Sequence, residues 1–294
     1  MENYHNLLRE ILTTGTWEEN RTGIRTQSIP GAMLKFDLRD GFPAITTKKL
    51  AFKAVVGELI GFLRGYTSAA DFRALGCNVW NENANDNRTW LASPYRAGTD
   101  DLGKLGYSHG WRNFGGDFDG TNGVDQIAWA LNEVRHNPTS RRILVNAWNP
   151  QDVHEGRAAL PPCHVLFQLI ARQDGTLHMV MYQRSVDSFL GLPFNISSYA
   201  LLLELYSAWS GRQAATLSMM LADVHIYENH LGQVHEQISR APYPLPKLCL
   251  RMDGTAHVDD LKTLLAKLNN TEPFPTAELI GYQHHPAIKA PMAV

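Results

Sequence analysis

The sequence has little cysteine, no excess of charge of one sign and no long apolar run. Only three cysteines occur among 294 residues, at Cys77, Cys163 and Cys249. An odd number at such wide spacing predicts neither a disulfide framework nor a zinc site. We therefore expect no metal in this protein. Sparse free thiols also favour a reducing compartment, so the expected location is the cytoplasm.

Charge and hydropathy exclude two further classes of protein. Lys and Arg number 27 against 29 Asp and Glu, a net charge of −2, which gives no generally basic surface of the kind that binds nucleic acid. No apolar run reaches the roughly 18 residues that a membrane helix requires. The first residues lack the basic and then apolar pattern of a signal peptide. We expect neither nucleic acid nor a membrane as a partner, although a local group of arginines could still bind one phosphate.

The composition is that of a globular protein, with 44% hydrophobic and 19% charged residues. No repeat, low-complexity tract or linker divides the chain, so we predict one domain, residues 1–294. A stretch rich in Asn and Gly over about 81–123 is expected to be a variable insert.

Hydrophobic periodicity predicts both helices and strands. The helices are expected at 52–65, 124–134, 197–209 and 227–239, and the strands at 143–148, 164–171 and 177–183. The last two strands flank Gln173-Asp174-Gly175, which is a hairpin signal. Because a hairpin joins antiparallel strands, the sequence does not favour a purely parallel sheet. The prediction is therefore an α/β (α+β) fold with a mixed sheet.

Cys163 is the first candidate for chemistry. It follows two prolines in Leu160-Pro161-Pro162-Cys163-His164 and precedes an apolar strand. It is either a core cysteine or a reactive thiolate with cationic neighbours. Because adjacent strand residues face opposite sides, His164 is unsuited as its base. A cysteine hydrolase needs such a base and an oxyanion hole, and neither is recognisable here.

Several arginines are the second candidate group. Arg21, Arg141-Arg142 and Arg184-Ser185 stand at predicted loop or strand ends. Each alone is typical of a solvated surface charge. Together their planar guanidinium groups and the hydroxyl suit a phosphate monoester.

Two further polar residues allow two interpretations each. Glu58 lies within an apolar helical pattern, where it forms either a structural ion pair or a carboxyl kept for proton transfer. Asn195 precedes a helical run and could cap it. Its amide can also donate and accept hydrogen bonds at once, as reading a pyrimidine edge requires.

In this order, the motifs of the chain resemble those of the thymidylate synthase family almost from end to end. That family comprises thymidylate synthases and pyrimidine-nucleotide hydroxymethylases. The matching pieces are Asn20-Arg21-Thr22-Gly23, Asp40-Gly41-Phe42-Pro43, Thr46-Thr47-Lys48-Lys49, Gly57-Glu58-Leu59, Val79-Trp80, Ser140-Arg141-Arg142, Ala147-Trp148-Asn149, Leu160 to His164, Gln183-Arg184-Ser185, Asp187, Phe189 to Asn195, Asp223 with His225 and Tyr227, and Ile288-Lys289-Ala290-Pro291.

The resemblance implies a fold, a substrate pair and a dimer. The fold would be one domain around a twisted mixed sheet with flanking helices, and one face of the sheet would pack against a second subunit. The substrate would be dUMP and the cosubstrate 5,10-methylenetetrahydrofolate. Thiolate addition at C6 of uracil would make C5 nucleophilic toward a one-carbon unit.

The resemblance also implies a role for each site residue. Cys163 would be the nucleophile, with Glu58, Tyr107, His164, Asn195, Arg184 and Asp187 as further catalytic groups. The nucleotide would be bound by Arg21, Arg184, Ser185, Asp187, Asn195, His225 and Tyr227, and by Arg141 and Arg142 from the partner subunit. The folate would contact Trp80, Leu160, Asp187, Leu190, Gly191, Phe194 and Ala293.

The chain departs from the family pattern mainly in one loop. Lys104 to Arg112 is one residue longer than usual, with Gly110 in the place of a glutamine and Tyr107 in the place of the family tyrosine. Smaller departures are Asn81 for Asp and Ala222 for Gly. The new His109 could position water beside the exocyclic methylene that forms at C5.

That loop bears on the product. Water addition would give 5-hydroxymethyl-dUMP and tetrahydrofolate, whereas hydride transfer would give dTMP and dihydrofolate. The altered loop favours a dUMP hydroxymethylase. Trp80 and the C-terminal segment 290–294 favour the alternative, a thymidylate synthase, because both shield the intermediate from solvent in synthases.

Overall fold

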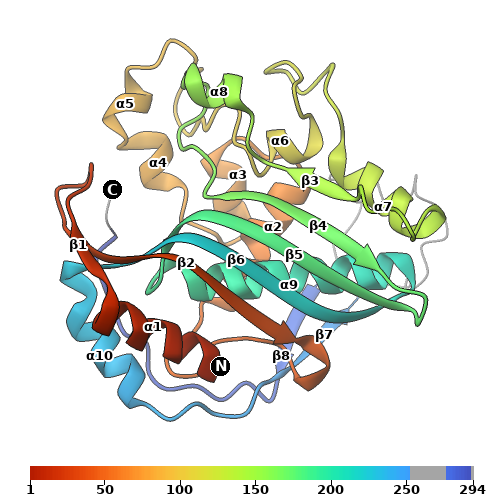
Figure 1. Cartoon of the computed structure of the whole chain (residues 1–294). Helices are drawn as coiled ribbons and strands as arrows, with labels where there is room; N and C mark the ends of the chain where they lie inside the picture. Colours follow the sequence, from red (N-terminus) through yellow and green to blue (C-terminus); the bar gives the residue numbers. More distant parts are fainter. Residues whose placement is uncertain (252–275, 293–294) are drawn as a thin grey trace.

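A six-stranded mixed sheet forms the centre of the fold in the computed structural model, which describes residues 1–251 and 276–292 (Figure 1). Its order is β1-β2-β6-β5-β4-β3, and every neighbouring pair is antiparallel except the parallel pair β5–β6. The strands are β1 (Thr16–Glu18), β2 (Thr26–Asp37), β3 (Leu144–Asn146), β4 (His164–Ala171), β5 (Thr176–Asp187) and β6 (Gln213–Tyr227). The predicted mixed α/β fold is confirmed.

Helices cover one face of this sheet and one end of it. They are α1 (Glu2–Thr14), α2 (Phe52–Leu63), α3 (Ala69–Ala74), α4 (Asn81–Asn85), α5 (Arg88–Leu91), α6 (His109–Arg112), α7 (Gln126–His136), α8 (Pro150–His154), α9 (Gly191–Ser210) and α10 (Leu231–Ser239). Two short strands, β7 (Lys247–Arg251) and β8 (Thr276–Ile280), form a separate antiparallel pair. Within the described residues, no helix is long and apolar enough to cross a membrane.

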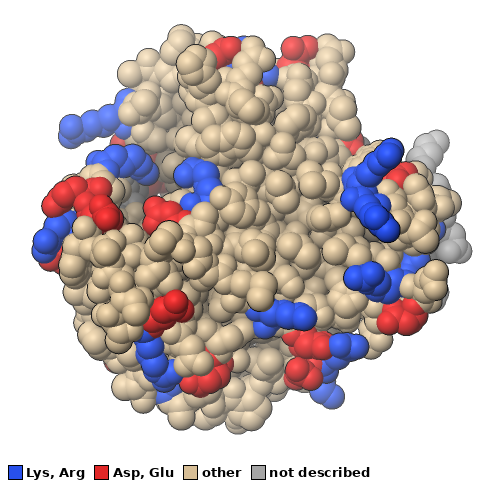
Figure 2. All heavy atoms as spheres, viewed as in Figure 1, with Lys and Arg blue, Asp and Glu red and all other residues tan. Residues whose placement is uncertain are grey.

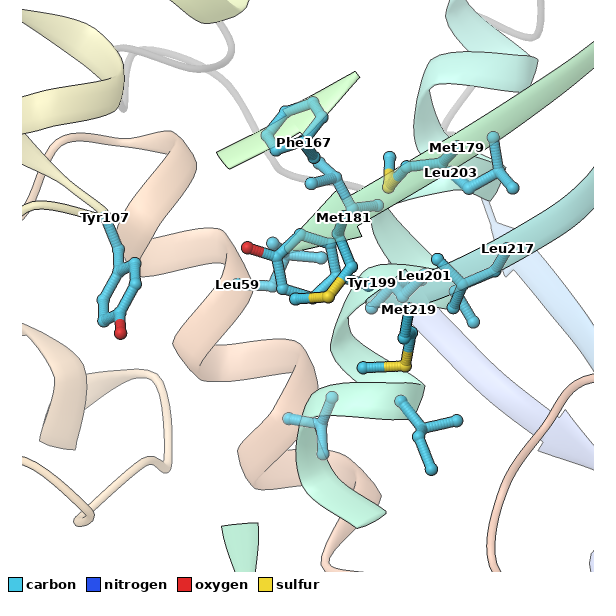
Figure 3. Packing of buried hydrophobic residues seen from close by; sticks show 14 of the residues in the cluster. Leu59, Tyr107, Phe167, Met179, Met181, Tyr199, Leu201, Leu203, Leu217 and Met219 are labelled. Atoms are coloured by element: carbon cyan, nitrogen blue, oxygen red, sulfur yellow. The ribbon is translucent and has the colours of Figure 1, made fainter. Parts of the chain in front are cut away.

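The core lies between the sheet and the long helix α9. Alternate residues of the central strands point inward, so Met181 and Met219 belong to one buried cluster with Leu201 and Leu203 of α9 (Figure 3). These side chains are at most 2% exposed. Burial of each such side chain is worth about 1.5–3 kcal/mol. This packing holds the ends of β5 and β6, and the start of α9, in fixed positions.

No helix of the described residues covers the opposite face of the sheet. Its middle is apolar: Met33, Met220 and Tyr182 are paired in register across β2, β6 and β5, and they are 61%, 41% and 39% exposed. Figure 2 looks onto this face, and its middle is almost free of charged side chains. An exposed apolar face of this kind marks an interaction surface.

Some predicted elements differ from the structure in their limits. The helix expected at 197–209 begins earlier, at Gly191, so Asn195 lies inside α9 and is not its cap. Asp187 occupies the turn before α9 instead and accepts hydrogen bonds from the N–H groups of Phe189 and Leu190. The helix expected at 227–239 begins only at Leu231, because Tyr227 still belongs to β6.

The stretch 81–123 contains three short helices, α4, α5 and α6. Large side chains anchor it, since Trp90, Leu102, Leu105 and Trp111 are buried. Apolar residues therefore fold this segment back over α2 and α3 in spite of its many Asn and Gly residues.

Candidate active site

Cys163 stands directly before β4, and Tyr107 from the lengthened loop holds it there. The phenol oxygen of Tyr107 accepts hydrogen bonds from the backbone N–H of Cys163 at 2.5 Å and of His164 at 3.1 Å. Tyr107 itself is buried against Phe62, Trp80 and other rings. The loop that bears the thiol is therefore fixed by a side chain distant in sequence.

Arg184 of β5 holds the same loop from the other side. Its backbone N–H donates to the carbonyl of Cys163 at 2.9 Å, and its Nε donates to the carbonyl of Pro162 at 2.9 Å. The guanidinium also lies 5.2 Å above the ring of Trp148. This places a permanent cation beside the thiol.

The thiol of Cys163 experiences opposing influences on its pKa. Burial raises the pKa, while the charges of Arg184 and Arg21 lower it. Burial is the larger effect, so the pKa lies above its ordinary value. The sequence predicts cationic neighbours that favour the thiolate. The two arginines do lower the pKa of the thiol, but burial has the larger effect.

His164, Asn195 and Gln183 form a polar group behind Cys163. The His164 ring is buried, 4.7 Å from the ring of Tyr107 and 5.3 Å from that of Tyr199. Burial lowers its pKa to about 4, so it is neutral near pH 7. Gln183 Nε2 donates to Asn195 Oδ1 at 3.1 Å, which fixes the orientation of that amide.

The parallel pair β5–β6 brings several polar side chains side by side. Ser185 is paired with Asp223, and Asp187 with His225. Asp223 Oδ1 lies 3.4 Å from His225 Nδ1, and the ring of His225 lies 5.2 Å from that of Tyr227. The charges of Asp187 and Arg21 influence Cys163 and also Tyr227, so these groups share one site.

Glu58 is buried in α2 and accepts a hydrogen bond from Trp80 Nε1 at 3.0 Å. Burial raises its pKa to about 8, while the bond from Trp80 acts in the opposite direction. The carboxyl is therefore protonated at neutral pH and is able to give up a proton. Among the described residues, burial and the bond from Trp80 are the influences on this carboxyl and no ion pair holds it, which favours the proton-transfer interpretation over the ion pair.

The start of α9 borders this group with an apolar edge. Leu190, Gly191 and Phe194 are partly exposed, whereas the residues around them in α9 are buried. Helical spacing places these residues on one side of α9 with Asn195. Leu160 is also partly buried, and Ala293 lies outside the described residues.

Arg141 and Arg142 do not join the other site residues. Both are exposed before β3, and the carbonyl of Arg141 accepts a hydrogen bond from Gln168 Nε2. Gln168 is four residues beyond His164 on β4, or roughly 13 Å along the strand. These two arginines therefore lie well away from Cys163 of their own chain.

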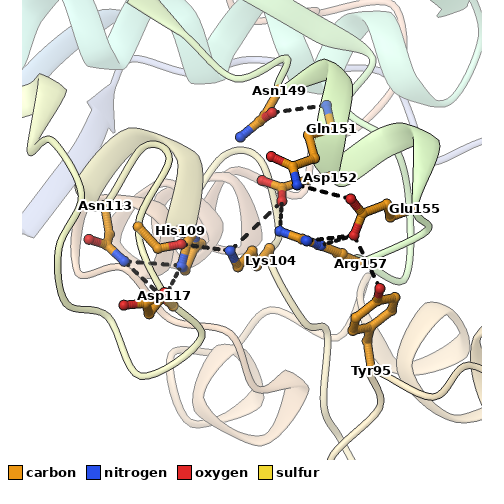
Figure 4. A network of polar contacts seen from close by, with 11 residues as sticks. Tyr95, Lys104, His109, Asn113, Asp117, Asn149, Gln151, Asp152, Glu155 and Arg157 are labelled. Carbon is orange, nitrogen blue, oxygen red and sulfur yellow. Dashed lines mark hydrogen bonds and ion pairs between the residues drawn. The ribbon is translucent and has the colours of Figure 1, made fainter.

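The lengthened loop is tied into a polar network (Figure 4). Lys104 Nζ donates to the carbonyl of Gly116 at 2.6 Å and lies 3.8 Å from Asp152 Oδ1. His109 Nε2 lies 2.7 Å from the carbonyl of Asp117 and 3.1 Å from Asn113 Nδ2. The contacts of His109 are thus with the following loop, and burial lowers its pKa.

Comparison with known proteins agrees with this arrangement. The family model described as thymidylate synthase matches residues 2–294. This chain belongs to the thymidylate synthase family. Over the full length of both chains, it is 43% identical to a thymidylate synthase of Bordetella parapertussis, and 40% identical to those of Pseudomonas syringae pv. tomato and Pseudomonas putida.

As a family member, the protein is a one-carbon transferase, and the family uses methylenetetrahydrofolate as its cosubstrate and binds dUMP and folate. Within the described residues, no group of His, Cys, Asp and Glu could hold a metal ion.

Three contributors to the site carried no role in the sequence analysis. Gln183 orients Asn195, Tyr199 packs on His164, and Trp148 lies under Arg184. Gln183 and Trp148 stand within motifs that match the family, so their positions could have indicated a place in the site. Tyr199 lies in an apolar helix and gave none.

Proposed function

We propose that the protein is a thymidylate synthase, which converts dUMP and methylenetetrahydrofolate to dTMP and dihydrofolate. The observation that carries this choice is the position of His109. Its ring nitrogen is engaged with the carbonyl of Asp117, so the one residue that favoured water delivery has a structural partner instead. Tyr107 meanwhile keeps its contact with the nucleophile loop. The relatives named thymidylate synthase support the same choice.

In this proposal the nucleotide lies beside Cys163, with its phosphate toward Arg21 and Arg184 and with Ser185 as a further ligand. His225 and Tyr227 bind the sugar, and Asn195 binds the pyrimidine edge. Oriented groups of this kind replace the water that the nucleotide loses on binding. Asp187 lies between the nucleotide and the folate edge formed by Leu190, Gly191 and Phe194.

The chemistry assigned to this chain consists of one covalent step and several proton transfers. The Cys163 thiolate adds to C6 of uracil and leaves again when the product is released. Glu58, protonated at neutral pH, supplies and recovers protons near the pyrimidine through water. The folate, when bound, supplies the one-carbon unit and the hydride. Trp80 keeps Glu58 oriented and excludes solvent from it.

We further propose that the protein works as a homodimer joined through the open sheet face. Met33, Met220 and Tyr182 form an apolar row there that a second copy would cover. Arg141 and Arg142, exposed and far from their own Cys163, would reach the phosphate in the partner's site. Residues 1–294 would then form one catalytic domain with the insert 81–123, and the reducing cytoplasm would keep its thiol available.

The test measures both products of one reaction. We expect dUMP and methylenetetrahydrofolate to give a nucleotide with the mass of dTMP and an equal amount of dihydrofolate, followed by its absorbance. Cys163→Ala should abolish turnover and covalent adduct formation with a 5-fluoro nucleotide, while Cys249→Ala should retain both. Formation of 5-hydroxymethyl-dUMP with tetrahydrofolate would contradict the proposal and support the hydroxymethylase instead.

A further inference from the structure

The buried His230 contacts the end of the chain. It is the last residue of a short 3-10 helix (Glu228–His230) between β6 and α10, and its side chain is 0% exposed. Its Nε2 lies 2.7 Å from the backbone carbonyl of Pro291, 61 residues away in sequence. Because that carbonyl can only accept, Nε2 carries the proton and donates it. Nδ1 is buried and finds no hydrogen-bond partner in the part of the chain that the structure describes.

The His230 ring also lies between two loops of the active site. Its centroid is 5.5 Å from that of Tyr227, which we assign to the sugar, and 5.5 Å from that of Phe189, next to the folate edge. Phe189 is in turn covered by the ammonium group of Lys48 at 3.4 Å. His230 therefore contacts the nucleotide side, the folate side and the C-terminal segment at once.

The segment before Pro291 is held in the same manner along α10. The carbonyl of Pro286 accepts from Arg240 Nη1 at 2.7 Å, and that of Lys289 accepts from Gln233 Nε2 at 3.5 Å. The accepting carbonyls follow the chain forward, from Pro286 to Lys289 to Pro291. Their donors follow it backward, from Arg240 to Gln233 to His230, so the segment runs antiparallel to α10. His230 makes the last of these contacts, and its ring also contacts Tyr227 and Phe189. Figure 1 shows α10 beside the C-terminal part of the chain.

We propose that His230 is a positioning residue that fixes the C-terminal segment relative to the bound nucleotide and folate through its Nε2–H. Its donor sets the place of the Pro291 carbonyl, while its ring packs against Tyr227 and Phe189. The inference rests on the proposed function, because it assigns the segment to the closure of that site. Gln233 and Arg240 also align the segment, through its Lys289 and Pro286 carbonyls.

Two substitutions separate the donor from the ring. His230→Phe keeps an aromatic ring between Tyr227 and Phe189 and removes the donor. His230→Gln places an amide N–H close to the position of Nε2 and removes the ring. His235→Phe and His235→Gln, at an exposed position of α10, are the matched controls.

We expect His230→Phe to raise KM for methylenetetrahydrofolate about tenfold, equivalent to about 1.4 kcal/mol, the size of one net hydrogen bond. Kd for dUMP should stay within about twofold, since the ring contact with Tyr227 is kept. His230→Gln should retain a KM close to that of the unmodified protein even where its thermal stability falls. Carboxypeptidase should release the last residues faster from the Phe variant than from the Gln variant and the controls.

A Phe variant with unchanged KM and unchanged carboxypeptidase rate would overturn the inference, as would a Gln variant as impaired as the Phe variant. If His230→Phe does not fold, His230→Asn serves in its place, because its shorter amide does not reach Pro291. Removal of residues 290–294 should make either substitution silent in KM, because the acceptor is then absent. These readouts do not depend on which nucleotide product forms. The proposed function is tested by the product of the unmodified protein, so its failure is distinguished from failure of the inference about His230.

Discussion

Glu58 is the residue whose protonation the fold controls most directly. Burial raises its pKa from 4.5 to about 8. Between these values the unfolded chain has released the proton and the folded protein still holds it. The free energy of unfolding therefore falls as pH rises, by at most about 1.4 kcal/mol per pH unit for this group.

Glu58→Gln should remove that dependence. We expect the variant to lose little stability between about pH 5 and pH 8, and to exceed the unmodified protein at the upper end, because an amide has no proton to lose. Urea unfolding at several pH values measures this. Glu10→Gln, at an exposed position of α1, should leave the slope as it is. An equally steep slope in Glu58→Gln would show that other groups cause it.

The amide of Asn195, which we assign to the pyrimidine edge, determines the expected choice of base. Gln183 donates to Asn195 Oδ1, which holds the amide in one orientation. The amide can accept from N3–H of uracil and donate to O4, whereas cytosine reverses both demands. We expect dUMP to be preferred over dCMP by about 1–3 kcal/mol in kcat/KM, the usual cost of a mispaired buried polar group. Asn195→Asp should reduce that preference, and equal use of both nucleotides by the unmodified protein would contradict the assignment.

Single residues differed in how far the sequence revealed them. Cys163 and Arg184 stand in contiguous motifs, so they were found from the sequence. The role of Gln183 depends on a contact with Asn195 from another element. His109 attracted a catalytic hypothesis because its partner, a backbone carbonyl in the next loop, has no signature in sequence.

At the scale of elements, Gly106 and Gly110 of the loop from Lys104 to Arg112 differ in the space around them. Both line a small cavity of about 30 Å³ behind Pro161 and Pro162. A Cβ on Gly110 would lie 3.5 Å from the nearest atom, the carbonyl oxygen of Ala147, which is ordinary contact. A Cβ on Gly106 would lie 2.6 Å from that oxygen and 3.0 Å from Pro162 Cγ.

We expect Gly110→Ala to stabilise the protein by about 0.5–1 kcal/mol, since it favours the helix α6 and fills space. Gly106→Ala should destabilise it by about 1–3 kcal/mol and lower kcat, because the methyl group displaces the loop that bears Cys163. Thermal unfolding and steady-state rates compare the two. Similar effects of both substitutions would mean that the loop adjusts freely to either methyl group.

The departure at Asn81 has a local explanation. Its Oδ1 accepts from Arg73 Nη1 at 2.9 Å, while the same guanidinium already pairs with Asp100 at 2.7 Å. A neutral amide is therefore sufficient at position 81, because the carboxylate comes from the insert. Nothing in the structure explains Ala222.

Short elements that end at proline or glycine were predictable from the sequence, and longer elements were not. β4 was placed with its observed limits, 164–171, and the helix at 52–65 nearly so. The long strands β2 and β6 were missed. Pro30-Gly31 reads as a turn within β2. β6 carries apolar residues on both faces, as at Met219 and Met220, so it lacks the alternating pattern of a half-buried strand. α9 is also apolar on most sides, so its first turn at Gly191–Phe194 was taken for a loop.

At the scale of the whole molecule, the proposed dimer predicts complementation. A mixed dimer with Cys163→Ala on one chain and Arg141→Ala on the other contains one site free of both changes. Partial activity should therefore return on mixing, although each variant alone is impaired. Activity is measured after exchange of subunits, verified by tags on the two chains. Verified mixed dimers without recovered activity would count against sharing of the site.

The overall fold class and the family were predictable from the ordered motifs, because each motif marks one strand or loop end. The arrangement of the sheet was not, since no local pattern tells that β6 lies between β2 and β5. The use of the open face likewise depends on a second molecule that the sequence of one chain does not describe.

The pairing of β2 with β6 has a consequence for how the chain reaches its folded state. The partners, from Asp37↔Thr216 to Thr26↔Tyr227, are separated by roughly 180–200 residues, and contacts between such distant residues slow folding. The sheet cannot close until most of the chain has been synthesised. The first two-thirds of the protein must therefore leave the ribosome with one edge of β2 unpaired, at a stage when aggregation competes with folding.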